Sequence, residues 1–128
     1  MRIAGLDHLV LTVADVDYTL DFYERVLGMK PVVFDEGRYA LAFGTQKINL
    51  HQAGREFEPK AAVPTPGSAD LCFLTNAPVV EVVERLQANN VEILEGPVRR
   101  TGATAPIMSV YFRDPDGNLI EVSGRIVT

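Results

Sequence analysis

The sequence is poor in cysteine and histidine, which limits the sites that it can build. Cys72 is the single cysteine among 128 residues, so we expect no internal disulfide and no zinc site made of several cysteines. This usage fits a reducing compartment and favours a cytoplasmic location. His8 and His51 are the two histidines, which leaves little room for a Ser/His/Asp triad. No glycine-rich phosphate-binding loop is present in the sequence either.

Long apolar runs and an excess of basic charge are also missing. The first apolar stretch is interrupted by Asp7 and Asp15, and the uncharged run over 101–112 contains Gly102 and Pro106. We therefore expect neither a membrane-spanning helix nor a signal peptide. The chain has 12 Lys and Arg against 17 Asp and Glu, a net charge of −5. Because such a surface repels phosphate backbones and anionic lipids, nucleic acids and membranes are not expected partners.

The sequence does contain a duplicated pattern within the length of one domain. With 128 residues, of which 47% are hydrophobic, the chain can bury a single globular core. Strands predicted at 8–13 and 70–75 are each followed by an apolar pattern of helical period.

Each predicted helix carries signals for its ends. Asp15 or Asp17 is the expected cap of the first helix, and Gly28 ends that helix. Asn76 is the expected cap of the second helix, which ends at residues 89–90. Three more strands are predicted after each helix, at 30–34, 38–43 and 47–52 in the first half and at 91–95, 107–112 and 118–123 in the second.

The resulting order, β-α-β-β-β twice, predicts an α+β fold of two βαβββ modules that form a cupped mixed sheet. We expect one domain over residues 1–128, with a first module at about 5–53, a linker over 54–67 that lacks regular structure, and a second module at about 68–125.

The duplication identifies candidate site residues, because polar residues at equivalent positions lie in otherwise apolar strands. His8 corresponds to Asp70, and Asn49 corresponds to Glu121. Burying Glu121 between apolar neighbours without a partner would cost several kcal/mol, so we expect a cation or hydrogen bonds there. One imidazole and two carboxylates, from His8, Asp70 and Glu121, are suitable ligands for divalent Fe, Mn, Ni, Co or Zn.

Three segments of the chain resemble the vicinal oxygen chelate superfamily, the group of glyoxalase I, bleomycin-resistance proteins and extradiol dioxygenases. They are Leu6-Asp7-His8-Leu9, Phe22-Tyr23-Glu24-Arg25-Val26-Leu27-Gly28, and the run from Phe112 through Arg113-Asp114-Pro115-Asp116-Gly117-Asn118-Leu119-Ile120 to Glu121. The resemblance implies two βαβββ modules, a small-molecule partner and pairing as a homodimer.

The resemblance also implies metal ligands at His8 and Glu121, which match the family pattern in residue type. The ligand that opens the second module is commonly histidine, whereas this chain has Asp70. Glyoxalase I has a further ligand where this chain has Asn49, with His51 two residues later on the same strand face. Asn49 is therefore a candidate for substrate binding. His51 is a candidate ligand or base, or an exposed strand residue.

The leading functional hypothesis is a divalent-metal-dependent enzyme of the lyase or isomerase type, like glyoxalase I, acting on a small substrate with vicinal oxygens. Glu121 is the first candidate for the catalytic base and His51 the second. The alternatives are a metal-free protein that binds a small molecule or an antibiotic, a ring-cleaving dioxygenase, and a fosfomycin-type thiol transferase. The dioxygenases usually have two histidines and one glutamate as metal ligands, whereas this chain has Asp70 where the second histidine would be.

Several other residues have two interpretations. Arg100 lies in the segment 99–104, which either clamps an anionic substrate, with Gly102 allowing the loop to move, or forms a solvated hairpin loop. Cys72 either borders the site or packs inertly in its strand. The remaining candidates, Tyr39, Phe57, Met108 and Tyr111, are expected in the core or at an interface.

Overall fold

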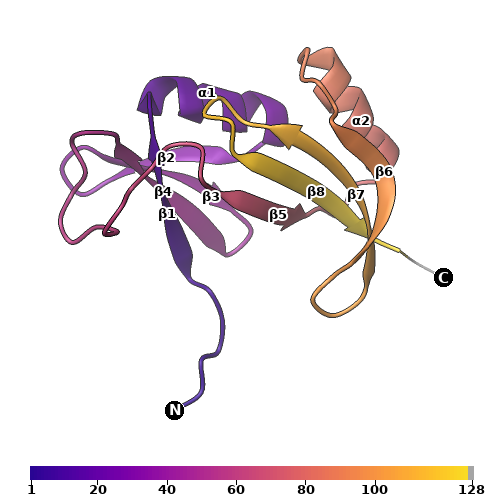
Figure 1. The fold of residues 1–128 in the computed structure, drawn as a ribbon, viewed down its shortest axis with the longest axis horizontal. Helices are drawn as coiled ribbons and strands as arrows, with labels where there is room; N and C mark the ends of the chain where they lie inside the picture. The colour runs from indigo at the N-terminus through magenta and orange to yellow at the C-terminus, as the bar shows by residue number, and fades with distance from the viewer. Residues whose placement is uncertain (127–128) are drawn as a thin grey trace. The chain divides into compact units, whose positions relative to one another are not determined.

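The computed structural model describes residues 1–126 as two compact units, one over Met1–Gly67 and one that begins at Ser68 (Figure 1). The first unit contains β1 (His8–Val13), α1 (Val16–Leu27), β2 (Lys30–Phe34), β3 (Arg38–Phe43) and β4 (Gln46–Gln52). The second contains β5 (Asp70–Leu74), α2 (Val79–Ala88), β6 (Glu95–Thr101), β7 (Pro106–Arg113) and β8 (Leu119–Arg125). The predicted order β-α-β-β-β, twice, is confirmed, and the fold is α+β.

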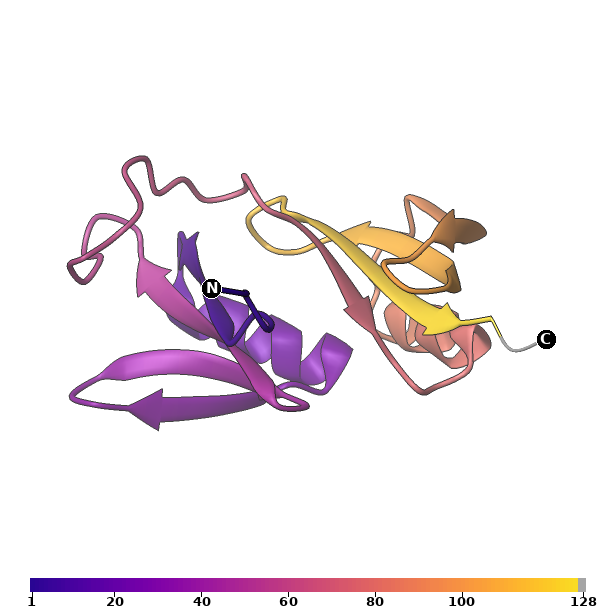
Figure 2. The same ribbon diagram turned by 90° about the horizontal axis from the view of Figure 1, so that it is seen from below.

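Each unit forms its own four-stranded mixed sheet. The strand order is β1-β4-β3-β2 in the first unit and β5-β8-β7-β6 in the second. In both sheets the first and last strands are parallel neighbours, and the other pairs are antiparallel. One helix packs on each sheet, α1 against β2, β3 and β4, and α2 against β7 and β8 (Figure 2). Each unit is therefore a βαβββ module with one face of its sheet covered by a helix.

The first helix begins and ends where the sequence indicates. Asp15 is the N-cap, and its side chain accepts a hydrogen bond from the backbone N–H of Tyr18. Gly28 follows the helix in the left-handed conformation, with φ of 69°, which a glycine adopts without strain. Apolar residues of α1 pack on the sheet because they recur on one side of the helix. Tyr23 and Val26 are buried there together with Leu41 and Ile48 of the sheet.

Two predictions for the second module are wrong in position. The strand expected at 91–95 is found at Glu95–Thr101. Pairing with β7 begins only at Glu95, and the strand register shifts between Glu95 and Val98. The N-cap of α2 is Pro78, not Asn76, and makes no side-chain capping hydrogen bond. Instead, Thr75 Oγ1 accepts a hydrogen bond from the backbone N–H of Ala77 ahead of the helix.

Strand register shows how closely the two modules correspond. Val10 pairs with Asn49 between β1 and β4, and Cys72 pairs with Glu121 between β5 and β8. His8 and Asp70 stand two residues before Val10 and Cys72, respectively. The equivalence predicted from sequence, of His8 with Asp70 and of Asn49 with Glu121, is therefore confirmed by the backbone pairing. Within residues 1–126, no helix is long and apolar enough to cross a membrane.

Candidate functional site

Two buried serines hold the carboxylate of Glu121. Glu121 lies in β8 and is partly exposed, whereas Ser109 in β7 and Ser123 in β8 are fully buried. Ser109 Oγ donates a hydrogen bond to Glu121 Oε2 at 2.5 Å, and Ser123 Oγ donates to the same oxygen at 3.3 Å. The two hydroxyls also contact each other at 2.6 Å. The carboxylate expected to need a partner is thus stabilised by hydroxyl donors on Oε2, and it also interacts with the side chains of Cys72 and Tyr111.

Cys72 continues this polar chain on the next strand. Its Sγ lies 3.4 Å from Ser123 Oγ, and the residue is exposed at the open face of the sheet. Partial burial raises the pKa of the Cys72 thiol, and the negative charges of Glu121 and Asp70 raise it further. The hydrogen bond with Ser123 opposes these effects. Cys72 is therefore a protonated thiol at neutral pH, bordering the site and poorly activated as a nucleophile.

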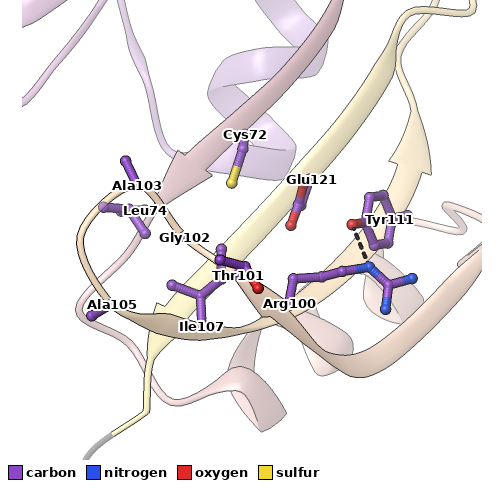
Figure 3. Close-up of a pocket in the computed structure, with 10 residues that line it drawn as sticks. All are labelled: Cys72, Leu74, Arg100, Thr101, Gly102, Ala103, Ala105, Ile107, Tyr111 and Glu121. Carbon is purple, nitrogen blue, oxygen red and sulfur yellow. Dashed lines mark hydrogen bonds between the residues drawn. The ribbon is translucent and has the colours of Figure 1, made fainter.

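A pocket of about 570 Å³ opens over this face of the second module. Cys72 and Glu121 project into the same space from β5 and β8, and Tyr111 projects from β7 (Figure 3). The apolar lining comes from Leu74, Ala103, Ala105 and Ile107. A carboxylate and a phenol in a mainly apolar cavity form a chamber suited to a small molecule with a few polar atoms.

Arg100 lines the same pocket, but its guanidinium is bonded within the module. Nε donates to the hydroxyl of Tyr111 at 3.0 Å, Nη2 donates to Glu95 Oε1 at 3.0 Å, and Nη1 donates to the carbonyl of Arg99. Burial raises the pKa of Tyr111, as does the charge of Glu121, and Arg100 opposes this shift. Arg100 therefore orients the phenol at the pocket wall.

The segment 99–104 is only partly the loop that the sequence indicated. Residues 99–101 belong to β6, and the turn begins at Gly102. The backbone N–H of Gly102 donates to the carbonyl of Ala105 at 3.0 Å, and a Cβ on Gly102 would lie 2.4 Å from that carbonyl oxygen. Glycine is required here by the close approach of backbone, which shapes the rim of the pocket.

In the first module, His8 is oriented by its sequence neighbour. His8 Nδ1 lies 2.8 Å from Asp7 Oδ1, and the His8 side chain is partly exposed at the start of β1. A carboxylate on one imidazole nitrogen leaves the other nitrogen to act as a ligand, which is the arrangement typical of metal-binding histidines. Asp70, the equivalent residue of the second module, is exposed at the start of β5.

Asn49 and His51 are both buried on β4. The exposed fraction is 7% for Asn49 and 3% for His51, so the interpretation of His51 as an exposed strand residue is wrong. Asn49 Oδ1 is buried without a hydrogen-bond partner among the described residues. His51 Nε2 lies 3.4 Å from Arg38 Nη2. Burial lowers the pKa of His51, and the charge of Arg38 lowers it further, so the imidazole is neutral at pH 7.

Each module by itself offers donor atoms that suit a divalent ion, although residues 1–126 contain no group of three His, Cys, Asp or Glu side chains arranged to hold one. His8 has one ring nitrogen on Asp7, which leaves the other nitrogen as a possible ligand, and Glu121 has Oε2 held by two serine hydroxyls. The unpartnered oxygen of Asn49 is a further neutral donor. Imidazole, carboxylate and amide oxygen are ligands that Mn²⁺, Fe²⁺ and Zn²⁺ accept.

Some residues of the site were missed from the sequence. Ser109 and Ser123 are polar positions in apolar strands, the same signal that identified Glu121. Arg38 was missed because it follows a turn and resembles a solvated residue in sequence. Phe57 was expected in the core or at an interface, but it is 40% exposed and contacts His51 edge to face.

A profile of the Glyoxalase/Bleomycin resistance protein/Dioxygenase superfamily matches residues 5–122. The chain belongs to this superfamily. The match includes both modules and the three segments that carry the resemblance. Membership confirms the family and the fold expected from the sequence.

Two curated relatives are similar over nearly the whole chain. Virulence protein STM3117 of Salmonella typhimurium is 61% identical over 123 residues, which are 96% of this chain and 85% of the relative. Glyoxalase domain-containing protein RDO1 of Mycosarcoma maydis is 57% identical over 96% of this chain and 69% of the relative. The crystal structure of STM3117 superposes with a TM-score of 0.97, covering 98% of this chain and 100% of that one. Neither name specifies a reaction.

More distant members of the superfamily differ in function. Metallothiol transferase FosB of Shouchella clausii is 30% identical over 92% of this chain and 78% of its own length. Two solved structures share the fold at lower identity. TnmS3, an antibiotic-binding protein from Streptomyces sp. CB03234, is 23% identical with a TM-score of 0.74, covering 98% of this chain and 99% of that one. FosX from Listeria monocytogenes, complexed with Mn(II), is 22% identical with a TM-score of 0.67, covering 98% and 94%.

Proposed function

We propose that the chain is a divalent-metal-dependent enzyme of the glyoxalase type, acting on a small substrate with two adjacent oxygens. The observation that carries the proposal is how hydrogen bonds orient the side chains of His8 and Glu121. His8 has one ring nitrogen on the Asp7 carboxylate, and Glu121 has one oxygen on two serine hydroxyls. Each side chain is thereby oriented by a neighbouring polar group, as metal-binding side chains commonly are.

In this proposal His8, Asp70 and Glu121 hold the ion. A divalent ion would polarise the vicinal oxygens of the substrate and stabilise negative charge that develops on them. Asn49 need not bind the ion. Its side-chain oxygen, which has no hydrogen-bond partner among the described residues, can accept a hydrogen bond from a substrate hydroxyl. FosX, a superfamily member by fold, contains Mn(II) in its structure.

Proton transfer is assigned to Glu121 first and to His51 second. Glu121 lines the pocket with Oε2 held by Ser109, and its carboxylate would accept a proton from a bound substrate when it is not on the ion. His51 is neutral at pH 7 and could also accept a proton, since burial and Arg38 lower its pKa. The apolar walls of the pocket, with Leu74 and Ile107, would exclude water from the substrate.

A metal-free binding protein is the second candidate, and the pocket itself favours it. A chamber of about 570 Å³ lined mainly by apolar atoms is sufficient to bind a small molecule without an ion. The 30% identity to FosB supports a metal-dependent thiol transferase as a third candidate. The ring-cleaving dioxygenases are a further alternative. A substrate screen with the methylglyoxal–glutathione adduct, fosfomycin and catechols separates the enzyme classes. Pairing as a homodimer stays a prediction.

Metal analysis tests the proposal directly. The full chain is loaded anaerobically with Mn²⁺, Fe²⁺, Ni²⁺ or Zn²⁺, dialysed and assayed for retained metal. We expect retention near one ion per chain, and an affinity at least about tenfold lower in Glu121→Gln and in His8→Ala. Glu84→Gln, an exposed carboxylate on α2, is the matched control and should bind as the wild type does. No retained ion, or unchanged affinity in both site variants, would leave the metal-free binding protein as the better account.

A further inference from the structure

The open face of the first module contains a guanidinium held by aromatic rings. Arg38 lies in β3 opposite Phe34 of β2. Its guanidinium carbon is 5.5 Å from the centre of the Phe34 ring and 4.6 Å from the centre of the Phe57 ring. Contacts with ring faces position a guanidinium without using its N–H donors. Arg38 is therefore fixed in place while its hydrogen-bonding edge remains available.

In the part of the chain that the structure describes, no acidic side chain pairs with this guanidinium. Among residues 1–126, Arg38 forms no ion pair with a carboxylate, although the chain carries 17 Asp and Glu. Its one hydrogen-bond contact is with the neutral imidazole of His51, at 3.4 Å. Arg100 differs, because its three nitrogens bond Tyr111, Glu95 and a backbone carbonyl. A guanidinium has five N–H donors, of which Arg100 uses three and Arg38 uses one, so Arg38 has more donors left for an external anion.

A second cation and a buried amide lie on the same face of the sheet. Lys47 Nζ is 3.8 Å from the centre of the Phe34 ring and, within the described chain, has no carboxylate partner either. Lys47, Asn49 and His51 alternate along β4, so their side chains point to one side of the sheet. The oxygen of Asn49 is buried without a hydrogen bond. The buried, unsatisfied oxygen of Asn49 is costly unless a ligand completes it, and two half-exposed cations without carboxylate partners lie on the same face.

We propose that this face, defined by Arg38, Lys47, Asn49 and the rings of Phe34 and Phe57, binds the oxyanion group of a small molecule. Arg38 donates two parallel hydrogen bonds to the oxyanion, as its planar fork allows. Lys47 supplies the second charge, and Asn49 accepts a hydrogen bond from a hydroxyl group of the same ligand. Carboxylate and phosphate share this chemistry. The site shares Asn49 with the substrate-binding role proposed above, but it requires no metal at His8, Asp70 and Glu121 and can be tested without one.

The test uses the metal-free full chain labelled with ¹⁵N. Sodium acetate and inorganic phosphate are added separately at constant ionic strength, and the arginine Nε–H signals are followed by NMR. We expect the Arg38 signal to shift saturably with one or both anions, and the stronger anion identifies the ligand group. Arg38→Gln should weaken binding by about tenfold or more, and Lys47→Gln by a smaller factor.

Two further variants keep the test decisive. Arg38→Lys retains the charge and loses the planar fork, so it should also bind more weakly than the wild type, and it serves if Arg38→Gln does not fold. Arg25→Gln removes an arginine of α1 that is paired with Asp21, and binding should not change. An Arg38 signal that shifts linearly without saturation, or equal binding by the wild type and both Arg38 variants, would overturn the proposal. Metal binding is measured separately, so either proposal can fail alone.

Discussion

The hydroxyl of Ser109 lies 2.5 Å from Oε2 of Glu121, across the pairing of β7 with β8. Ser109 is fully buried, and its oxygen also contacts Ser123 Oγ at 2.6 Å. A carboxylate held by a buried hydroxyl keeps its orientation when a ligand is absent. Ser109 is therefore a positioning residue for Glu121.

Replacing Ser109 by alanine should weaken divalent-metal binding by about tenfold, because Glu121 then rotates freely before it binds the ion. Titration calorimetry with Mn²⁺ measures the change, and urea unfolding of the metal-free chain separates it from lost stability. Ser123→Ala is the comparison, since its bond to Glu121 is longer, at 3.3 Å, and its effect should be smaller. Equal affinities in the wild type and Ser109→Ala would show that the serine does not position the carboxylate.

The folded protein should lose stability as the pH falls through the ordinary pKa of histidine, in part because of His51. Its pKa is lowered in the fold by burial and by Arg38, so the unfolded chain binds a proton more readily. The contribution is complete above about pH 6.5, declines below it, and is fully lost below the lowered folded pKa. Urea unfolding at several pH values between about 7.5 and 5.5 measures it, because carboxylates remain ionised there.

His51→Gln provides the control for this pH dependence. The variant should show a smaller loss of unfolding free energy over the same pH range than the wild type does. Glu56 does not confuse the comparison, because backbone hydrogen bonds lower its pKa and its contribution is lost only at more acidic pH. Identical slopes for the two proteins would mean that His51 titrates normally in the fold.

Gly102→Ala should destabilise the second module by about 1–3 kcal/mol, because the new Cβ would lie 2.4 Å from the carbonyl oxygen of Ala105. The backbone of residues 102–105 must then move, and this changes the rim of the pocket. Urea unfolding gives the stability, and amide chemical shifts locate the movement. Gly5→Ala is the matched control, since a Cβ there meets nothing within 4 Å. Equal stability of both variants would show that the turn adapts without cost.

The elements that sequence patterns predicted well are those with strong local signals. The period of apolar residues in α1, its Asp15 cap and its Gly28 end all agree with the structure. The correspondence of Asn49 with Glu121 was also predictable, because duplicated strands keep the same register.

The elements that could not be predicted depend on partners distant in sequence. Val91 to Glu95 alternates like a strand, yet pairing with β7 is registered only from Glu95, and the register shifts between Glu95 and Val98. The contact of Phe57 with Arg38 joins a segment without helix or strand to β3, and no periodic pattern encodes it. Hydrogen bonding of Glu121 by Ser109 likewise requires knowledge of which strands are neighbours.

The position of β8 inside its sheet has a consequence for truncated forms of the protein. β8 is the last strand in sequence, yet it lies between β5 and β7. During synthesis, the second sheet therefore cannot close until its final residues have left the ribosome. A premature stop codon before residue 119 would delete an interior strand, leaving β5 without a neighbour and Ser109 buried without its carboxylate. Such fragments are expected to be substrates for chaperones and proteases.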